Sequence, residues 1–389
     1  MWDGPVTSPV IAVPRSARAG RVAAIRDAMI EAGYDALVIA GRGVISQYGF
    51  LEYVAGYCPV VRSAYAVLGR EGDVAMVVPT AADGWYARQL ADLDDVRVAG
   101  QGDVFSEYDD LASGVVSALT DCGATRGRVG VVGLRHIVPV VEYELLRSRL
   151  PNAELADATS LVAQVKAVKA EEELDEIRRT AAIADAGFEA GLAQLRPGAS
   201  GWEVSAAMEQ AARALGARGE VLIFLSADPY FLARPDARAF AAGDLVTAYI
   251  ELTGPTGYWL EHASLVALGG LDDARATLVE ATLAAAAAAD SELRVGRAAG
   301  DVARVMDEIV ERFDLRSGIW HGHGVGIDHD SPVITATDTT PLVERMVVSI
   351  HPNFSAADES NGASVADTYI VRDGDPERLS NVRRELLRR

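Results

Sequence analysis

The chain has few cysteines and few basic residues, and each shortage excludes a class of protein. The two cysteines, Cys58 and Cys122, are too few and too far apart for a disulfide framework or a zinc knuckle. Basic residues number 36 against 56 acidic ones, which gives a formal net charge of −20. This charge repels phosphate backbones and anionic membrane surfaces, so we expect neither a nucleic acid nor a membrane as a partner.

Long apolar runs are absent as well. The sequence contains no uninterrupted apolar run of about eighteen residues, the length that begins to predict a membrane span, although half of its residues are hydrophobic. Residues 1–13 contain prolines and an acidic residue where a secretory signal needs a basic start and an apolar centre. We therefore expect a soluble, cytoplasmic protein with a large buried core.

The length and the order of the sequence patterns predict two domains. A chain of 389 residues exceeds what one hydrophobic core usually organises. The pattern loosens between Ala158 and Val165, so we place one domain at residues 1–165 and the other at 166–389. Both halves mix short apolar runs with helical periodicity, which predicts an α/β (α+β) fold.

Periodicity and turn residues locate the expected elements. Helices are predicted at residues 16–33, 109–120, 170–195, 201–215, 276–291 and 299–312. Strands are predicted at residues 36–40, 65–68, 74–78 and 129–132. A glycine-rich turn at 253–257 joins the apolar runs 245–252 and 258–269, which predicts a β-hairpin in the second domain.

Half of the six histidines lie in one glycine-rich stretch. Residues 320–332 read W-H-G-H-G-V-G-I-D-H-D-S-P and include His321, His323 and His329. Glycine lets backbone and ligand approach closely, and imidazole near neutral pH can bind a metal, carry a proton or form a hydrogen bond. We therefore expect this stretch to line an active site.

The order of several motifs resembles the creatinase/aminopeptidase P/methionine aminopeptidase family, whose catalytic domain has the pita-bread fold. The matching motifs are residues 169–178, 196–198, 243–246, 257–258, 322–326, 346–352 and 367–368. The resemblance implies an N-terminal creatinase-like domain with a mixed sheet and a C-terminal pita-bread domain of the peptidase M24 type. It also implies a homodimer, because the N-terminal domain of relatives caps the active site of the other subunit.

Metallopeptidases of this family bind two metals with two aspartates, one histidine and two glutamates. The corresponding positions of this chain are, in that order, Tyr249, Glu261, His323, His351 and Ala366. Only the histidine is kept, although Glu251 lies on the same strand face as Tyr249 and is an alternative for the first position. The resemblance therefore implies that a complete dinuclear metal centre is missing.

Two interpretations of the remaining groups stay open. The first is a metal-free acid–base site in which the catalytic residues are Glu261, His323, His329 and His351. The second is a single iron, zinc or manganese ion held by Glu261, His323 and His351, because two imidazoles and one carboxylate form known mononuclear sites. The side chains expected to contact the substrate are Tyr57, Arg62, Phe231, Tyr249, Glu251 and His321.

These residues lead us to expect a non-peptidase hydrolase that cleaves a carbon–nitrogen bond in a small carboxylated or guanidino-like molecule. Creatine is disfavoured as the substrate, because Leu232 stands where the catalytic histidine of creatinase would fall. One alternative is a lyase or other biosynthetic enzyme with a mononuclear metal. Another is a catalytically inactive, peptidase-like binding module.

Overall fold

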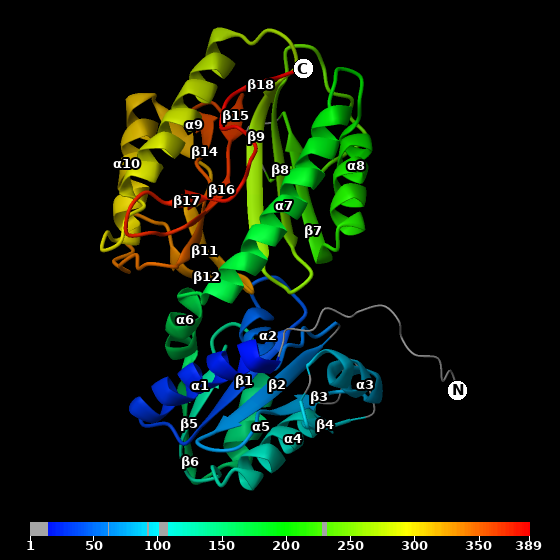
Figure 1. The fold of residues 1–389 in the computed structure, drawn as a ribbon, viewed down its shortest axis with the longest axis vertical. Helices are drawn as coiled ribbons and strands as arrows, with labels where there is room; N and C mark the ends of the chain where they lie inside the picture. The colour runs from blue at the N-terminus through cyan, green and yellow to red at the C-terminus, as the bar shows by residue number, and fades with distance from the viewer. Residues whose placement is uncertain (1–14, 61, 92, 101–107, 228–231) are drawn as a thin grey trace. The chain divides into compact units, whose positions relative to one another are not determined.

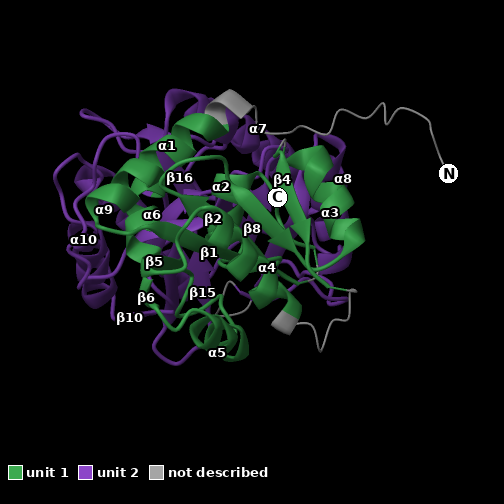
Figure 2. Cartoon of the chain, turned by 90° about the horizontal axis from the view of Figure 1, so that it is seen from below, with its two compact units in different colours: residues 1–166 green, residues 167–389 purple. Residues whose placement is uncertain are grey.

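The structure is a computed structural model that divides into two compact units, residues 1–166 and residues 167–389 (Figure 2). It describes residues 15–60, 62–91, 93–100, 108–227 and 232–389. Each unit combines helices with β-sheet (Figure 1), which confirms the predicted α/β (α+β) class. Within these described ranges, no helix is long and apolar enough to cross a bilayer.

The described part of the N-terminal unit is built on a six-stranded mixed sheet with the strand order β4-β3-β2-β1-β5-β6. The central strand β1 runs antiparallel to β2 and parallel to β5. The strands are β1 Ala36–Arg42, β2 Ser63–Gly69, β3 Ala75–Val78, β4 Asp95–Val98, β5 Gly127–Val132 and β6 Ala153–Asp157. The helices are α1 Arg15–Glu31, α2 Gly49–Ala55, α3 Ala81–Leu90, α4 Tyr108–Asp121, α5 Val140–Arg149 and α6 Thr159–Ala167.

Helix α6 occupies the stretch in which the sequence pattern loosens. The Asp157 carboxylate accepts hydrogen bonds from the backbone N–H of Thr159 at 3.0 Å and from its hydroxyl at 2.6 Å, which caps the start of the helix. Val162 is fully buried in the first turns. Capping and the buried side chains of Val162, Lys166 and Ala167 therefore make a helix where the short amphipathic pattern gave too weak a signal.

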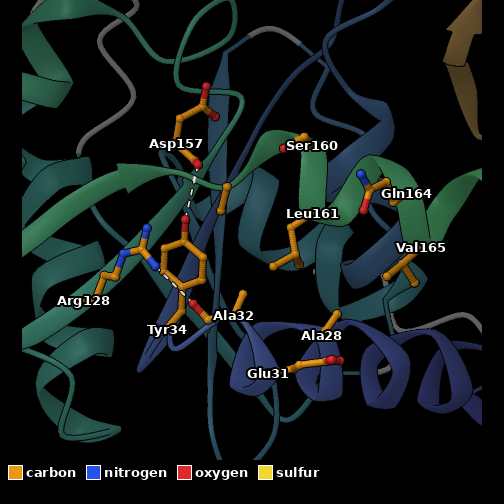
Figure 3. A pocket seen from close by; sticks show the side chains of 11 residues that line it. Ala28, Glu31, Ala32, Tyr34, Arg128, Asp157, Ser160, Leu161, Gln164 and Val165 are labelled. Atoms are coloured by element: carbon orange, nitrogen blue, oxygen red, sulfur yellow. Dashed lines mark hydrogen bonds between the residues drawn. The ribbon is translucent and has the colours of Figure 1, made fainter. Parts of the chain in front are cut away.

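The N-terminal unit has a surface cavity of about 440 Å³ between α1, α6 and the sheet (Figure 3). The Tyr34 hydroxyl donates to the Asp157 carbonyl at 3.3 Å, and Arg128 donates to the Ala32 carbonyl at 3.0 Å. The Arg128 guanidinium also lies over the Tyr34 ring, 4.3 Å from its centroid. None of the predicted site residues lines this cavity, so it is separate from the predicted active site.

Three sheets form the described part of the C-terminal unit: β18-β9-β8-β7, β12-β11-β13-β16-β17 and β10-β14-β15. The strands of the first sheet are β7 Arg218–Ser226, β8 Leu245–Thr253, β9 Trp259–Ala267 and β18 Leu387–Arg388. The others are β10 Leu315–Ser317, β11 Gly322–Gly326, β12 Asp328–Val333, β13 Val347–Ile350, β14 Asn353–Ala356, β15 Gly362–Ser364, β16 Asp367–Ile370 and β17 Glu377–Arg378. Strands β8 and β9 pair along their whole length, which confirms the predicted hairpin.

Two pairs of helices cover these sheets (Figure 1). The first pair is α7 Glu171–Gln194 and α8 Gly201–Ala214, and α7 packs on β8 and β9. The second pair is α9 Asp273–Glu292 and α10 Ala299–Arg312. Helix α9 buries Ala281, Ala285 and Ala289, and these small side chains let it approach its neighbours closely.

Strand β9 joins the first sheet to the second. Ala263 of β9 and Ala366, just before β16, exchange backbone hydrogen bonds of 3.0 and 3.1 Å. The Thr368 hydroxyl donates to the carbonyl of Glu261 at 3.0 Å. These contacts bring β9, β16 and its neighbour β13 together, so side chains that are far apart in sequence can meet at this junction.

The C-terminal segment is fixed to the same junction by buried charges. Asp367 is 3% exposed and accepts from the Arg384 Nε at 2.9 Å, and it pairs with Arg378 at 2.7 Å. Arg384 also binds Asp290 of α9 at 2.8 Å and the Tyr369 hydroxyl. One arginine thus ties the end of the chain to both β16 and α9.

We predict that Arg384→Met lowers the free energy of unfolding by about 3 kcal/mol, because it leaves the buried carboxylate of Asp367 with one cation fewer. Urea denaturation of the full chain would measure the loss. The control is Arg383→Met, whose side chain is 84% exposed and lies 3.9 Å from Glu385. It should change stability by less than about 0.5 kcal/mol, and equal losses in the two variants would contradict the buried attachment.

Candidate active site

Glu261 is the centre of the candidate site. Its side chain is 1% exposed on β9, and its Oε1 lies 2.9 Å from the Nε2 of His323. Its Oε2 accepts hydrogen bonds from the Tyr249 hydroxyl at 2.7 Å and from the Ser349 hydroxyl at 2.8 Å. Two neutral donors therefore hold Oε2, and Oε1 faces the imidazoles.

His323 lies in β11, where glycines bring backbones unusually close. A Cβ at Gly324 would lie 2.2 Å from the Ser331 carbonyl oxygen, and one at Gly322 would lie 2.2 Å from that of Ser349. The glycines of this stretch therefore let neighbouring strands approach each other closely, whereas the sequence led us to expect close approach of a ligand. This approach of the strands holds His323 between β12 and β13, beside Glu261.

The protonation of His323 follows from its two neighbours. The Nδ1 of His323 lies 2.9 Å from the Gly324 carbonyl oxygen. A carbonyl oxygen can only accept a hydrogen bond, so Nδ1 is the donor. The other ring nitrogen, Nε2, faces Glu261. Burial lowers the pKa of His323, but the charge and hydrogen bond of Glu261 outweigh it and raise this pKa to about 9. Burial likewise acts to raise the pKa of Glu261, and His323 holds it below its usual value.

Two further imidazoles face this pair. The ring of His329 lies 4.3 Å from that of His323, and the ring of His351 lies 5.5 Å from it, measured between centroids. Burial, and after it the positive charge of His323, lower the pKa of His329 to about 3. Burial lowers the pKa of His351 to about 4, although Glu261 acts in the opposite direction. Both rings are therefore neutral at pH 7.

Tyr249 and Glu251 both lie beside Glu261. Glu251 is its direct partner across the β8–β9 hairpin, and Tyr249 contacts it through the hydroxyl. Burial, and then the charge of Glu261, raise the pKa of Glu251 well above its usual value. The same two causes raise the pKa of Tyr249. Both shifts favour the protonated, uncharged form of the side chain.

The donor set fits a single divalent ion. One ligand atom each from Glu261, His323 and His351 lies within 4.8 Å of the others, and all three residues are buried. Two imidazoles and one carboxylate are a donor set that holds a single divalent ion in known proteins. Glu251, Glu261 and His329 form a second set in the same place.

Other predicted site residues lie outside this group. His321 hydrogen bonds to Asp307 of α10 at 2.7 Å, and its ring packs against that of Phe354. In the N-terminal unit the Tyr57 hydroxyl donates to Asp83 at 2.9 Å. Burial raises the pKa of Glu142 to about 7, although the charges of Arg42 and Arg62 act in the opposite direction. Phe231 lies outside the described residues.

Two contacts at or next to the site were not expected from the sequence. Ser349 precedes His351 by two residues, so strand alternation could have placed it near the site. The second is a buried ion pair of 2.9 Å between Lys169 and Asp330, the neighbour of His329. No local pattern predicts it, because the two residues lie 161 positions apart.

Comparison with known proteins identifies both halves of the chain. Residues 175–373 match the metallopeptidase family M24, and residues 21–168 match the creatinase/prolidase N-terminal domain. A Xaa-Pro dipeptidase of Pyrococcus furiosus is 25% identical over 242 residues, which cover 60% of this chain and 69% of the relative. An uncharacterised hydrolase/peptidase of Sinorhizobium fredii is 24% identical over 392 aligned residues, covering 96% of this chain and 97% of the relative.

The fold agrees with these matches. A solved structure of a Xaa-Pro dipeptidase from Bacillus anthracis superposes with a TM-score of 0.78 at 19% identity, covering 96% of this chain and all of that one. This likeness confirms a creatinase-like N-terminal domain followed by a pita-bread domain.

The predicted non-peptidase function is contradicted by the relatives, which are named as dipeptidases and peptidases. The prediction of a carbon–nitrogen hydrolase for guanidino-like substrates is therefore wrong, and its lyase and inactive alternatives have no support. The prediction assumed that a chain without the full set of ligands for two metals cannot be a peptidase. One ion can both polarise a carbonyl and activate water, so that conclusion does not follow.

An enzyme is supported, because the named relatives are hydrolytic. The M24 match covers just over half of the 389 residues and includes Glu261, His323 and His351. This chain belongs to the metallopeptidase family M24.

Proposed function

We propose that this chain is a peptidase that hydrolyses a short peptide at one divalent ion held by Glu261, His323 and His351. The observation that carries the proposal is the convergence of their three buried ligand atoms within 4.8 Å. The names of the relatives support a peptide substrate, and they make dipeptides with proline at the second position the first candidates.

A divalent ion at this site supplies a Lewis acid for the scissile carbonyl and for water. The protein orients the ligand atoms. Tyr249 and Ser349 hold Oε2 of Glu261, and the Gly324 carbonyl holds Nδ1–H of His323. These partners leave Oε1 and Nε2 as the atoms that would bind the ion, and such supporting hydrogen bonds fix ligand orientation in metal sites.

Two other titratable groups lie at the same site. The Nε2 of His329 lies 4.0 Å from Glu261 Oε1, and 25% of the His329 side chain is exposed. Its imidazole can form a hydrogen bond with water or with the substrate. Burial favours the protonated form of Glu251, which can give a proton to the leaving amine nitrogen.

The metal assignment predicts about one tightly bound iron, zinc or manganese ion per chain. His351→Ala should lose the ion and reduce the hydrolysis of Ala-Pro by at least about 100-fold, because it removes a ligand. Elemental mass spectrometry and a proline-release assay would measure both. His136→Ala is the control, because this exposed histidine belongs to the N-terminal unit.

The outcomes separate the two parts of the proposal. If the wild type contains no metal after chelation and still hydrolyses Ala-Pro at its full rate, the metal assignment is wrong and the peptidase assignment is retained. If the metal-loaded wild type cleaves no peptide in a dipeptide library, the peptidase assignment is wrong.

The His323–Glu261 pair predicts a pH dependence of stability in the metal-free protein. The pKa of folded His323 is about 9, above an unfolded value of about 6.5. Its contribution to the free energy of unfolding is therefore complete below about pH 6.5 and is lost as the pH rises through 9. Urea denaturation in chelator should show this fall in the wild type and a smaller one in His323→Gln. Parallel pH profiles would refute it.

We also propose a homodimer in which Arg62 and Tyr57 contact the substrate. The match of residues 21–168 to the creatinase/prolidase N-terminal domain supports this proposal. Sedimentation equilibrium should give a mass of about twice the 41.2 kDa of one chain. A single species with the mass of one chain at micromolar concentration would rule the dimer out.

A further inference from the structure

Trp259 lies beside the candidate active site and has no part in the chemistry described so far. It begins β9, two residues before Glu261, so the two side chains face the same side of the strand. Its indole packs edge-on against the imidazole of His329, with centroids 5.2 Å apart and planes at 87°. The indole is therefore a neighbour of the most exposed imidazole of the site.

The indole N–H of Trp259 has no hydrogen-bond partner among the described residues, although the side chain is 1% exposed. Other aromatic polar groups nearby are paired. The neighbouring Tyr258 hydroxyl donates to Glu173 at 2.7 Å. Even the exposed Trp202 donates its N–H to the Pro235 carbonyl at 3.1 Å. An indole nitrogen can only donate, and a buried donor without an acceptor destabilises the folded chain, so a ligand that brings an acceptor would relieve this cost.

The neighbouring carboxylate of Glu261 favours an uncharged hydrogen-bond acceptor at the indole N–H. The carboxylate of Glu261 lies two residues away on the same strand face. A substrate carboxylate at the indole would place a second carboxylate beside it in a buried site, whereas a peptide carbonyl oxygen carries no charge. His329, which contacts the indole, is itself 4.0 Å from Glu261 Oε1.

We propose that the indole N–H of Trp259 donates a hydrogen bond to the carbonyl oxygen of the scissile peptide bond. Trp259 is then a substrate-binding residue that fixes the carbonyl beside His329. This inference rests on the proposed peptidase function and adds a named contact to it.

The test compares Trp259→Phe, which keeps an aromatic ring but removes the N–H, with the wild type. Two probes are used: Ala-Pro, and its reduced analogue in which the scissile carbonyl is a methylene. The variant should lower kcat/KM for Ala-Pro by at least about five-fold, the effect of losing one buried hydrogen bond. The inhibition constant of the reduced analogue, which lacks the acceptor, should stay within about two-fold.

A second readout separates substrate binding from a structural role. Without substrate, Trp259→Phe should unfold at the same temperature as the wild type or higher, because it removes an unpaired buried donor. The matched control Trp202→Phe removes an N–H that is bonded within the protein. Trp202→Phe should leave kcat/KM for Ala-Pro unchanged and should not raise the unfolding temperature.

Each outcome decides the matter. Equal kcat/KM in wild type and Trp259→Phe overturns the proposal, and so does an equal loss with both probes, which would indicate packing alone. If the variant does not fold, indole ¹⁵N NMR of the wild type replaces it, with the Trp259 signal assigned by exclusion through substitution of the other four tryptophans. A shift of that signal with Ala-Pro but not with the analogue supports the contact, and no shift refutes it. Failure of the wild type to cleave any peptide would instead refute the proposed function.

Discussion

The site depends on one buried carboxylate, that of Glu261. An ionised carboxylate without partners would be very costly in an interior where it is 1% exposed. Two hydroxyls and one imidazolium offset this cost, and they come from three different strands: Tyr249 from β8, Ser349 from β13 and His323 from β11. The charge that chemistry requires thus also joins the two sheets of the C-terminal unit.

Backbone contacts between β9 and the chain entering β16 position the carboxylate of Glu261. Ala263 and Ala366 have side chains small enough for β9 and the chain entering β16 to exchange backbone hydrogen bonds. The hydroxyls of Tyr249 and Ser349 then supply hydrogen bonds to Glu261 at this junction.

The sequence predicted the hairpin, the long helices and the group of Glu261, His323 and His351, because strand alternation, helical periodicity and motif order are local properties. It did not predict α6, whose helix depends on capping by Asp157. It placed His321 with the substrate, whereas the structure pairs it with Asp307 of α10. The ion pair of Lys169 and Asp330 and the unpaired N–H of Trp259 depend on long-range packing, which no spacing encodes. The function was not predictable from the ligand positions alone, because changed ligands do not by themselves exclude peptide hydrolysis at one ion.

The distribution of protons in the site bears on the proposed metal binding. In the metal-free protein His323 holds the positive charge opposite Glu261, while His329 and His351 stay neutral. If Glu261 and His323 hold the proposed ion, His323 would bind it as a neutral imidazole, and Tyr249, Ser349 and Gly324 could keep their hydrogen bonds to Glu261 Oε2 and His323 Nδ1. His351 is neutral already and would give up no proton. Metal binding would therefore require the loss of one proton from one imidazole, and the same hydrogen bonds would orient the ligand atoms.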